Sequence, residues 1–179
     1  MMHGTLDPNR RVLLTCTVTG LCAAIAAPAL SQVQPPEPAR APGSRPQRPA
    51  PLAPSLVETF VRKAHADLQA TRTLLAETPG LLNATWDWGG GDFETGLGGA
   101  GHMGHREIAE FLISQGARMD VFVAAMLGRL DIVQAMLAAY PGLLHAKGPH
   151  GITLMAHARK GGAPAEPVVA FLESQGLKS

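Results

Sequence analysis

Histidines are the residues of this chain whose type and spacing could support chemistry. Imidazole is a common transition-metal ligand and the usual general base near neutral pH. The candidates are His102, His105, His145, His150 and His157. A metal-dependent or small-molecule site could use His102, His105 or His150 together with Asp92. However, Gly104 is expected to break the helix between His102 and His105, and structural or exposed roles are expected for the histidines. We therefore predict no metal ligand and no cofactor.

Three acids lie in the stretch WDWGGGDFET, Trp86–Thr95, which also holds both tryptophans of the chain. Asp87, Asp92 and Glu94 could form a paired-carboxylate acid–base site or a calcium loop. Their spacing does not match the calcium-binding loop of an EF-hand. A solvated turn is the expected structure for these acids.

Sequence motifs for catalysis are missing from the chain. It has no H-E-x-x-H, no G-x-S-x-G and no P-loop pattern. Gly96–Gly101 formally matches G-x-G-x-x-G, but no apolar strand precedes it, so a dinucleotide site is not predicted. No catalytic residue is assigned, and the protein is not expected to be an enzyme.

Residues 1–31 have the layout of a secretory signal peptide. Arg10 and Arg11 precede an apolar stretch without charge, and small residues follow. The arginine pair is typical of the twin-arginine type, with cleavage after Ala29 or Ser31. The apolar stretch is too short to predict a membrane span that stays after cleavage. We therefore expect the mature protein to be periplasmic and to lack both cysteines.

Residues 32–54 are rich in proline and are predicted to form a disordered, extended linker. Residues 55–179 follow as a single domain. The whole chain has 15 Lys and Arg against 14 Asp and Glu, and the domain has no cluster of Lys and Arg. This balance argues against a nucleic-acid partner.

Apolar residues recur with the period of an α-helix throughout residues 55–179, without an alternating strand pattern of comparable length. In each of four segments a short helix is followed by a turn and a longer helix with paired apolar residues. These pairs are Leu74–Leu75, Leu112–Ile113, Met136–Leu137 and Phe171–Leu172. Each helix pair has one apolar face and can bury it only against a neighbouring pair. The pattern predicts an all-α fold of stacked helix pairs.

The second pair carries the pattern of an ankyrin repeat most fully. The matching residues are Thr95, Leu97, Ala100, Gly104, His105, Glu107, Ile108, Leu112, Gly116 and Ala117 in the second repeat, Ala124, Ala125, Gly128, Leu130, Asp131, Ile132, Val133 and Leu137 in the third, and Gly151, Thr153 and Ala158 in the fourth. Residues 55–179 thus resemble an ankyrin-repeat solenoid of about four repeats with short finger loops. The first and last repeats match more weakly, as capping repeats do.

The resemblance implies that the protein binds a partner through its finger loops and concave face. The stretch Trp86–Thr95 would be a long finger, with Trp86, Trp88, Asp92 and Phe93 as anchors, because exposed tryptophan is a frequent binding hot spot. Weaker contact candidates are Met126, Arg129 and His150.

Two further expectations concern this finger. The rings of Trp86 and Trp88 are expected to point to opposite faces, so that one packs on the first repeat and the other is exposed. The glycines of the following helix, Gly96–Gly101, are expected to leave a shallow groove beneath the finger.

The sequence thus favours a non-catalytic, monomeric interaction module of the periplasm with an unknown protein partner. The alternative is a metal-dependent or small-molecule-binding protein that uses the finger histidines and aspartate. A third interpretation, an accessory that stabilises an exported enzyme, is not separated from general binding by the sequence.

Overall fold

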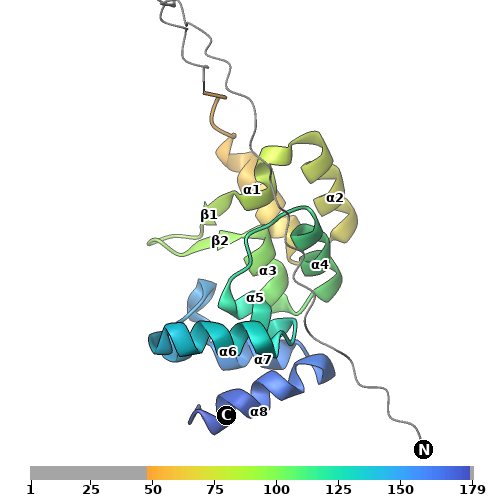
Figure 1. Cartoon of the computed structure of the whole chain (residues 1–179). Coiled ribbons are helices and arrows are strands. Elements are labelled where there is room, and N and C mark those ends of the chain that lie inside the picture. Colours follow the sequence, from red (N-terminus) through yellow and green to blue (C-terminus); the bar gives the residue numbers. More distant parts are fainter. Residues whose placement is uncertain (1–47, 178–179) are drawn as a thin grey trace, which may run out of the picture. The chain divides into compact units, whose positions relative to one another are not determined.

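Helices dominate the computed structural model, which describes residues 48–177 (Figure 1). The predicted signal peptide and residues 32–47 of the predicted linker lie outside the described residues. The α-helices are α1 (Pro54–Ala64), α2 (Leu68–Glu77), α3 (Gly96–Met103), α4 (Arg106–Ser114), α5 (Val121–Met126), α6 (Leu130–Ala139), α7 (Leu154–Lys160) and α8 (Glu166–Ser174). The described residues are mostly helical, as predicted for the domain. No helix within the described residues has the length and apolar character needed to cross a membrane.

Short 3-10 helices and one small sheet connect these helices. They are η1 (Pro79–Asn83), β1 (Thr85–Asp87), β2 (Phe93–Thr95), η2 (Pro141–His145), η3 (Pro149–Gly151) and η4 (Ala163–Ala165). The strands β1 and β2 pair antiparallel, with Trp86 opposite Glu94. The sequence pattern did not predict this sheet, because three-residue strands are too short to show an alternation.

Side chains of Asp and Thr define the start of four helices. Asp67, Thr95, Asp120 and Thr153 each accept a hydrogen bond, of 2.9–3.2 Å, from the backbone N–H three residues further on. Such caps satisfy N–H groups that have no partner inside the helix. They recur at the starts of α2, α3, α5 and α7, so the sequence sets these boundaries locally.

The first helices of successive pairs pack on one another. α1 contacts α3, α3 contacts α5, and α5 contacts α7, while α2 contacts α4 and α6 contacts α8. Phe60, Leu97 and Leu112 are buried in the cluster formed mainly by the first two pairs, and Leu154 and Leu172 in the cluster formed by the last two. The core is therefore shared between neighbouring pairs.

Neighbouring side chains cover Gly96, Gly99 and Gly101 of α3, so the groove expected beneath the finger does not extend over these three glycines. Gly98 does line a groove together with Asp92 and Phe93 of the finger. A Cβ at Gly96 would lie 2.8 Å from the Phe60 ring, one at Gly99 2.6 Å from the His65 ring, and one at Gly101 3.0 Å from Val123. The missing Cβ atoms allow these side chains to approach the helix backbone closely. The glycine face of α3 therefore positions His65.

The hairpin explains the three consecutive glycines. Gly89, Gly90 and Gly91 all have positive φ, which glycine adopts at little cost. The backbone N–H groups of Gly89 and Gly91 both donate to Asp87 Oδ1. Asp87 therefore stabilises the turn, as expected for a solvated turn.

Trp86 and Trp88 are both half-buried and pack against the same hydrophobic cluster. The expectation that they point to opposite faces was wrong, because residues two apart in an extended segment share a face. Neither ring is free to act as a fully exposed anchor.

The turn between α5 and α6 gives a direct test of this packing. Gly128 has a φ of 73°, and a Cβ there would collide with the carbonyl oxygen of Pro164. We expect Gly128→Ala to lower the free energy of unfolding by about 2–4 kcal/mol, from backbone strain and overpacking. Chemical denaturation of the full chain measures this change.

Gly142→Ala is the matched control, because a Cβ at Gly142 meets no atom within 4 Å. Its unfolding free energy should stay within about 0.5 kcal/mol of the unmodified protein. Equal stability of the Gly128 and Gly142 variants would contradict the close contact between this turn and η4.

Candidate metal centre

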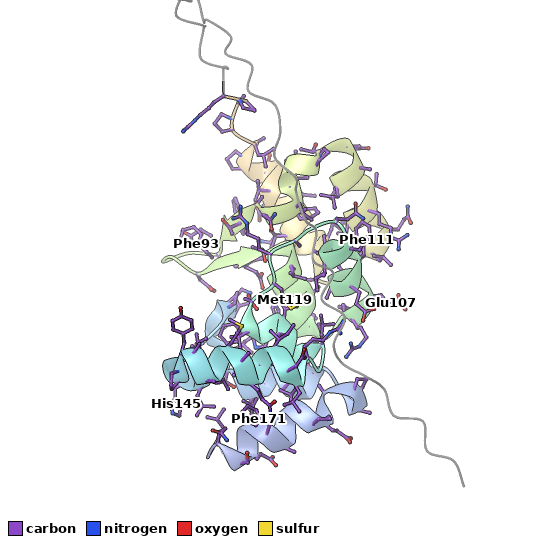
Figure 2. The ribbon with its side chains drawn as sticks, viewed as in Figure 1. Phe93, Glu107, Phe111, Met119, His145 and Phe171 are labelled. Atoms are coloured by element: carbon purple, nitrogen blue, oxygen red, sulfur yellow. The ribbon has the colours of Figure 1, made fainter. Side chains whose placement is uncertain are left out.

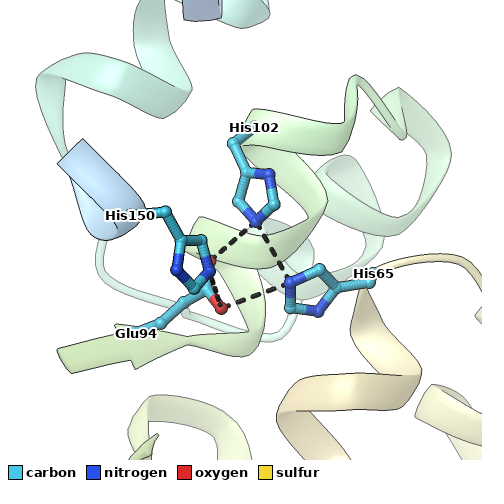
Figure 3. Close-up of side chains that lie close together, drawn as sticks. All are labelled: His65, Glu94, His102 and His150. Carbon is cyan, nitrogen blue, oxygen red and sulfur yellow. Dashed lines mark hydrogen bonds and ion pairs between the residues drawn. The ribbon is translucent and has the colours of Figure 1, made fainter. Parts of the chain in front are cut away.

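Four side chains from four separate elements converge on one point. His65 follows the last residue of α1, Glu94 lies in β2, His102 in α3 and His150 in η3 (Figure 3). One nitrogen or oxygen atom from each residue lies within 4.8 Å of the others. The cluster therefore joins the first, second and fourth helix pairs.

The ring of His65 is oriented by two neighbours. Its Nδ1 lies 2.8 Å from the carbonyl oxygen of Val61. The ring lies against Gly99, where a Cβ would come within 2.7 Å of the same nitrogen. These contacts turn Nε2 toward Glu94.

Glu94 reaches the cluster because of the hairpin register. It lies between Phe93, whose side chain is 60% exposed, and the half-buried Thr95. Successive side chains of a strand point to opposite faces, so the exposure of Phe93 accompanies the burial of Glu94. The Glu94 residue is only 1% exposed, which contradicts the expected solvated turn for this acid.

His150 has an unusual backbone that Asp92 stabilises. Its φ of 58° is the one positive value at a non-glycine position among the described residues. Its backbone N–H donates to Asp92 Oδ1 at 2.9 Å, and its Nδ1 lies 2.9 Å from Asp92 Oδ2. The left-handed conformation costs a side-chain-bearing residue about 1–2 kcal/mol. Both carboxylate oxygens thus fix the ring and the backbone of His150.

The Nε2 atoms of the three histidines all face the Glu94 carboxylate. Nε2 of His102 lies 2.9 Å from Oε1, while Nε2 of His65 and of His150 lie 3.2 Å and 3.4 Å from Oε2. The Nε2 atoms of His65 and His102 are 3.1 Å apart. The indole N–H of Trp88 also donates to Oε2, at 2.8 Å.

Hydrogen-bonding rules make this arrangement unfavourable for neutral histidines alone. The carbonyl of Val61 and the ionised carboxylate of Asp92 can only accept, so Nδ1 of His65 and of His150 carries the hydrogen. In a neutral ring Nε2 then presents a lone pair, and here it faces an acceptor oxygen of Glu94. A proton or a metal ion between these atoms would turn these contacts into favourable ones.

Glu94 concentrates the negative charge of the site. Its Oε1 is buried and has no aligned hydrogen-bond donor among the described residues, although His102 is close. Burial raises the pKa of this carboxyl. The adjoining His102 and His65 rings and the Trp88 N–H lower the pKa by a larger amount, so the net pKa lies well below its usual range. Glu94 is therefore ionised at neutral pH.

His65 responds to the same charge. Its contact with Glu94 raises the pKa of the imidazole, against the opposing effect of burial. A raised pKa indicates that this position favours a positive charge. The cluster is therefore electrostatically suited to a cation.

The cluster opens on one side into a pocket of about 440 Å³, lined by Arg62, His65, Trp88, His102 and His150. The guanidinium carbon of Arg62 lies 4.4 Å from the centre of the Trp88 ring. Glu94 lies below these residues and does not line the pocket. The site is thus reachable from solvent.

The residues predicted to contact a partner lie in different environments. His150 belongs to the cluster, and Trp88 and Asp92 lie beside it, bonded to Glu94 and His150. Met126 is fully buried, so its expected role as a contact residue is wrong, because its side chain belongs to the core. Arg129 is exposed at the start of α6. Figure 2 shows Phe93 projecting from the hairpin.

The other histidines among the described residues, His105, His145 and His157, lie outside the cluster. His105 and His145 are exposed. His157 is buried, with Nδ1 2.9 Å from the Thr153 carbonyl oxygen, and burial lowers the pKa of its ring. A structural role fits His157, as expected.

Sequence reasoning missed His65 and placed Glu94 in solvent. His65 ends a helix in an ordinary sequence, KAHAD, and no motif marks it as a ligand. Only the packing of α1 on α3 brings it near His102. For Glu94 a signal was available. Phe93 was expected to be exposed, and the next side chain of an extended segment points to the opposite face.

Comparisons with known proteins leave this geometry as the main evidence on function. No protein-family model matches the chain, and a search of the curated proteins found no match.

Proposed function

We propose that this chain is a metal-binding protein in which His65, Glu94, His102 and His150 hold one divalent transition-metal ion. The supporting observation is that three Nε2 atoms and a buried carboxylate face one point while the opposite nitrogens of His65 and His150 are bonded to oxygens. Metal-bound histidines typically donate their other N–H to a carbonyl or carboxylate. This proposal replaces the sequence-based expectation of a site without metal.

The ligand set favours zinc. Three imidazoles and one carboxylate suit zinc, copper or nickel, whereas calcium and magnesium prefer sites made of oxygen ligands. Zinc commonly takes four ligands in a tetrahedral arrangement. A divalent ion would also supply the counter-charge that the buried Glu94 lacks.

The ankyrin-type architecture remains part of the proposal. It is supported by the contacts between successive first helices and by threonine caps at Thr95 and Thr153. Export to the periplasm also remains a proposal, since it rests on residues 1–31.

A second candidate function is partner binding through the same finger, and Phe93 favours it. This side chain is 60% exposed beside a groove of about 340 Å³ that Asp92, Lys147 and Pro149 also line. Metal ligands lie in the hairpin and in η3, so a bound ion would fix the two walls of this groove. The two functions are therefore compatible.

Metal analysis tests the proposed centre. The full chain is incubated with zinc and then dialysed, and its metal content is measured by inductively coupled plasma mass spectrometry. It should retain about one ion per chain. Its melting temperature should rise with zinc and fall with a chelator, because an ion that binds only the folded state stabilises it by about 2.7 kcal/mol at 100 times its Kd. His102→Ala and Glu94→Gln should lose the ion.

Matched controls separate the centre from adventitious binding. His105→Ala and His145→Ala change exposed histidines outside the cluster and should retain the ion. Asp92→Asn should weaken binding by about 10–100-fold, as loss of a supporting carboxylate does elsewhere. Equal zinc content in the His102 and His145 variants would refute the proposal.

The glycines of α3 offer a test of the geometry in which none of the proposed ligands is substituted. Gly99→Ala places a Cβ 2.6 Å from the His65 ring and should displace it, with a loss of zinc affinity of about tenfold or more. In Gly98→Ala the new Cβ lies no nearer than 3.4 Å to any neighbour. That variant should bind zinc normally and gain about 0.5–1 kcal/mol of stability. Equal zinc affinities of the Gly99→Ala and Gly98→Ala variants would contradict the described contact between His65 and Gly99.

In-cell crosslinking tests the second candidate function. Phe93→Ala should lose a partner that the unmodified protein captures, because an exposed aromatic side chain is removed from the groove. Tyr140→Ala removes a side chain that is 69% exposed after α6 and should keep that partner. Retention by both variants would place the binding surface elsewhere.

A further inference from the structure

The proposed metal centre is open to solvent on one side only. Glu94 and His102 are buried, whereas His150 has a side-chain exposure of 34%. The three histidines line the open pocket and Glu94 lies beneath it. An ion held by all four residues would therefore have protein below it and an accessible face above it.

Glu94 leaves room for a further ligand. Its Oε2 accepts the Trp88 N–H, while the buried Oε1 has no aligned donor. This difference favours binding of the ion through one carboxylate oxygen. Zinc can expand from four to five ligands, so a small molecule can occupy the accessible face.

The charges of the pocket favour an anion at this face. A divalent ion with one carboxylate and three neutral imidazoles has a net charge of +1, and Arg62 adds a positive charge among the lining residues. Asp92 lies behind His150, and Glu58 pairs with Arg62. These acids support side chains of the pocket and are not among its lining residues.

Arg62 is held in a suitable position. Its Nε and Nη2 atoms lie 2.9 Å and 2.8 Å from Glu58 Oε1, and its guanidinium stacks on Trp88. Within the described part of the chain, Nη1 makes no hydrogen bond. A planar guanidinium with a free N–H edge matches the oxygens of carboxylates and phosphates.

We propose that this pocket binds a small oxyanion, a carboxylate or a phosphate, with one oxygen on the metal and another on Arg62. The inference rests on the proposed metal centre. It names the class of ligand that the site binds. The ion would then have an open position for an exchangeable ligand, whereas a structural metal site has none.

Cobalt is the probe for the experiment, because the visible absorption of Co²⁺ reports its coordination number. The full chain is loaded with Co²⁺, its metal content is measured, and acetate and inorganic phosphate are titrated in separate series. Acetamide serves as the uncharged control. Acetate or phosphate should change the spectrum saturably, and acetamide should not.

Two arginine variants test the second contact. Arg62→Gln should weaken anion binding by roughly fivefold at unchanged metal content, the effect of losing one charge-assisted hydrogen bond at a partly exposed site. Arg72→Gln is the matched control, because Arg72 also stacks on an aromatic ring, Phe111, but lines a different pocket. It should bind the anion normally.

The outcomes distinguish the two proposals. A response to acetate alone or to phosphate alone identifies the source of the oxyanion, and either supports the inference. Bound cobalt without any response to the anions would overturn this inference and leave the metal centre intact. Failure to bind cobalt or zinc would overturn both. Equal affinities of the Arg62 and Arg72 variants would overturn the assigned role of Arg62.

Discussion

The burial of the Glu94 carboxylate is the constraint on which the site depends. An ionised carboxylate without water is costly unless charge and hydrogen bonds compensate it. Trp88 provides one hydrogen bond, and the three histidines present nitrogens that need a proton or a metal ion to make favourable contact. The surrounding residues are thus explained by a single requirement, a cation next to Glu94.

Local strain at His150 is consistent with this requirement. Its left-handed backbone persists because Asp92 holds both the backbone N–H and the ring. Asp92 is itself placed by the glycine turn of the hairpin. Strained backbone at a position where surrounding contacts determine the conformation is a frequent feature of functional sites. The hairpin and η3 therefore form one unit around the cluster.

The cluster also changes how the helix pairs depend on each other. In a repeat array each unit contacts mainly its neighbours, so stability propagates stepwise. Here His65 of the first pair and His150 before the last pair approach the same carboxylate, next to α3. An ion at this point would link helix pairs that are far apart in the sequence. The hairpin and η3, which hold Glu94 and His150, also line the groove beside Phe93, so the ion would affect both the pocket and this groove.

Local sequence is sufficient to specify the helical content, the caps at Thr95 and Thr153 and the pairing of helices, because these depend on local hydrogen bonds and apolar periodicity. It also marked the stretch Trp86–Thr95 as unusual. The burial of Glu94 and the contact between His65 and His102 arise from packing between separate elements. Those contacts follow from α1 resting on the glycine face of α3, a close approach between segments far apart in sequence. No local pattern encodes such a distance, which is why the ligands could not be assigned from spacing.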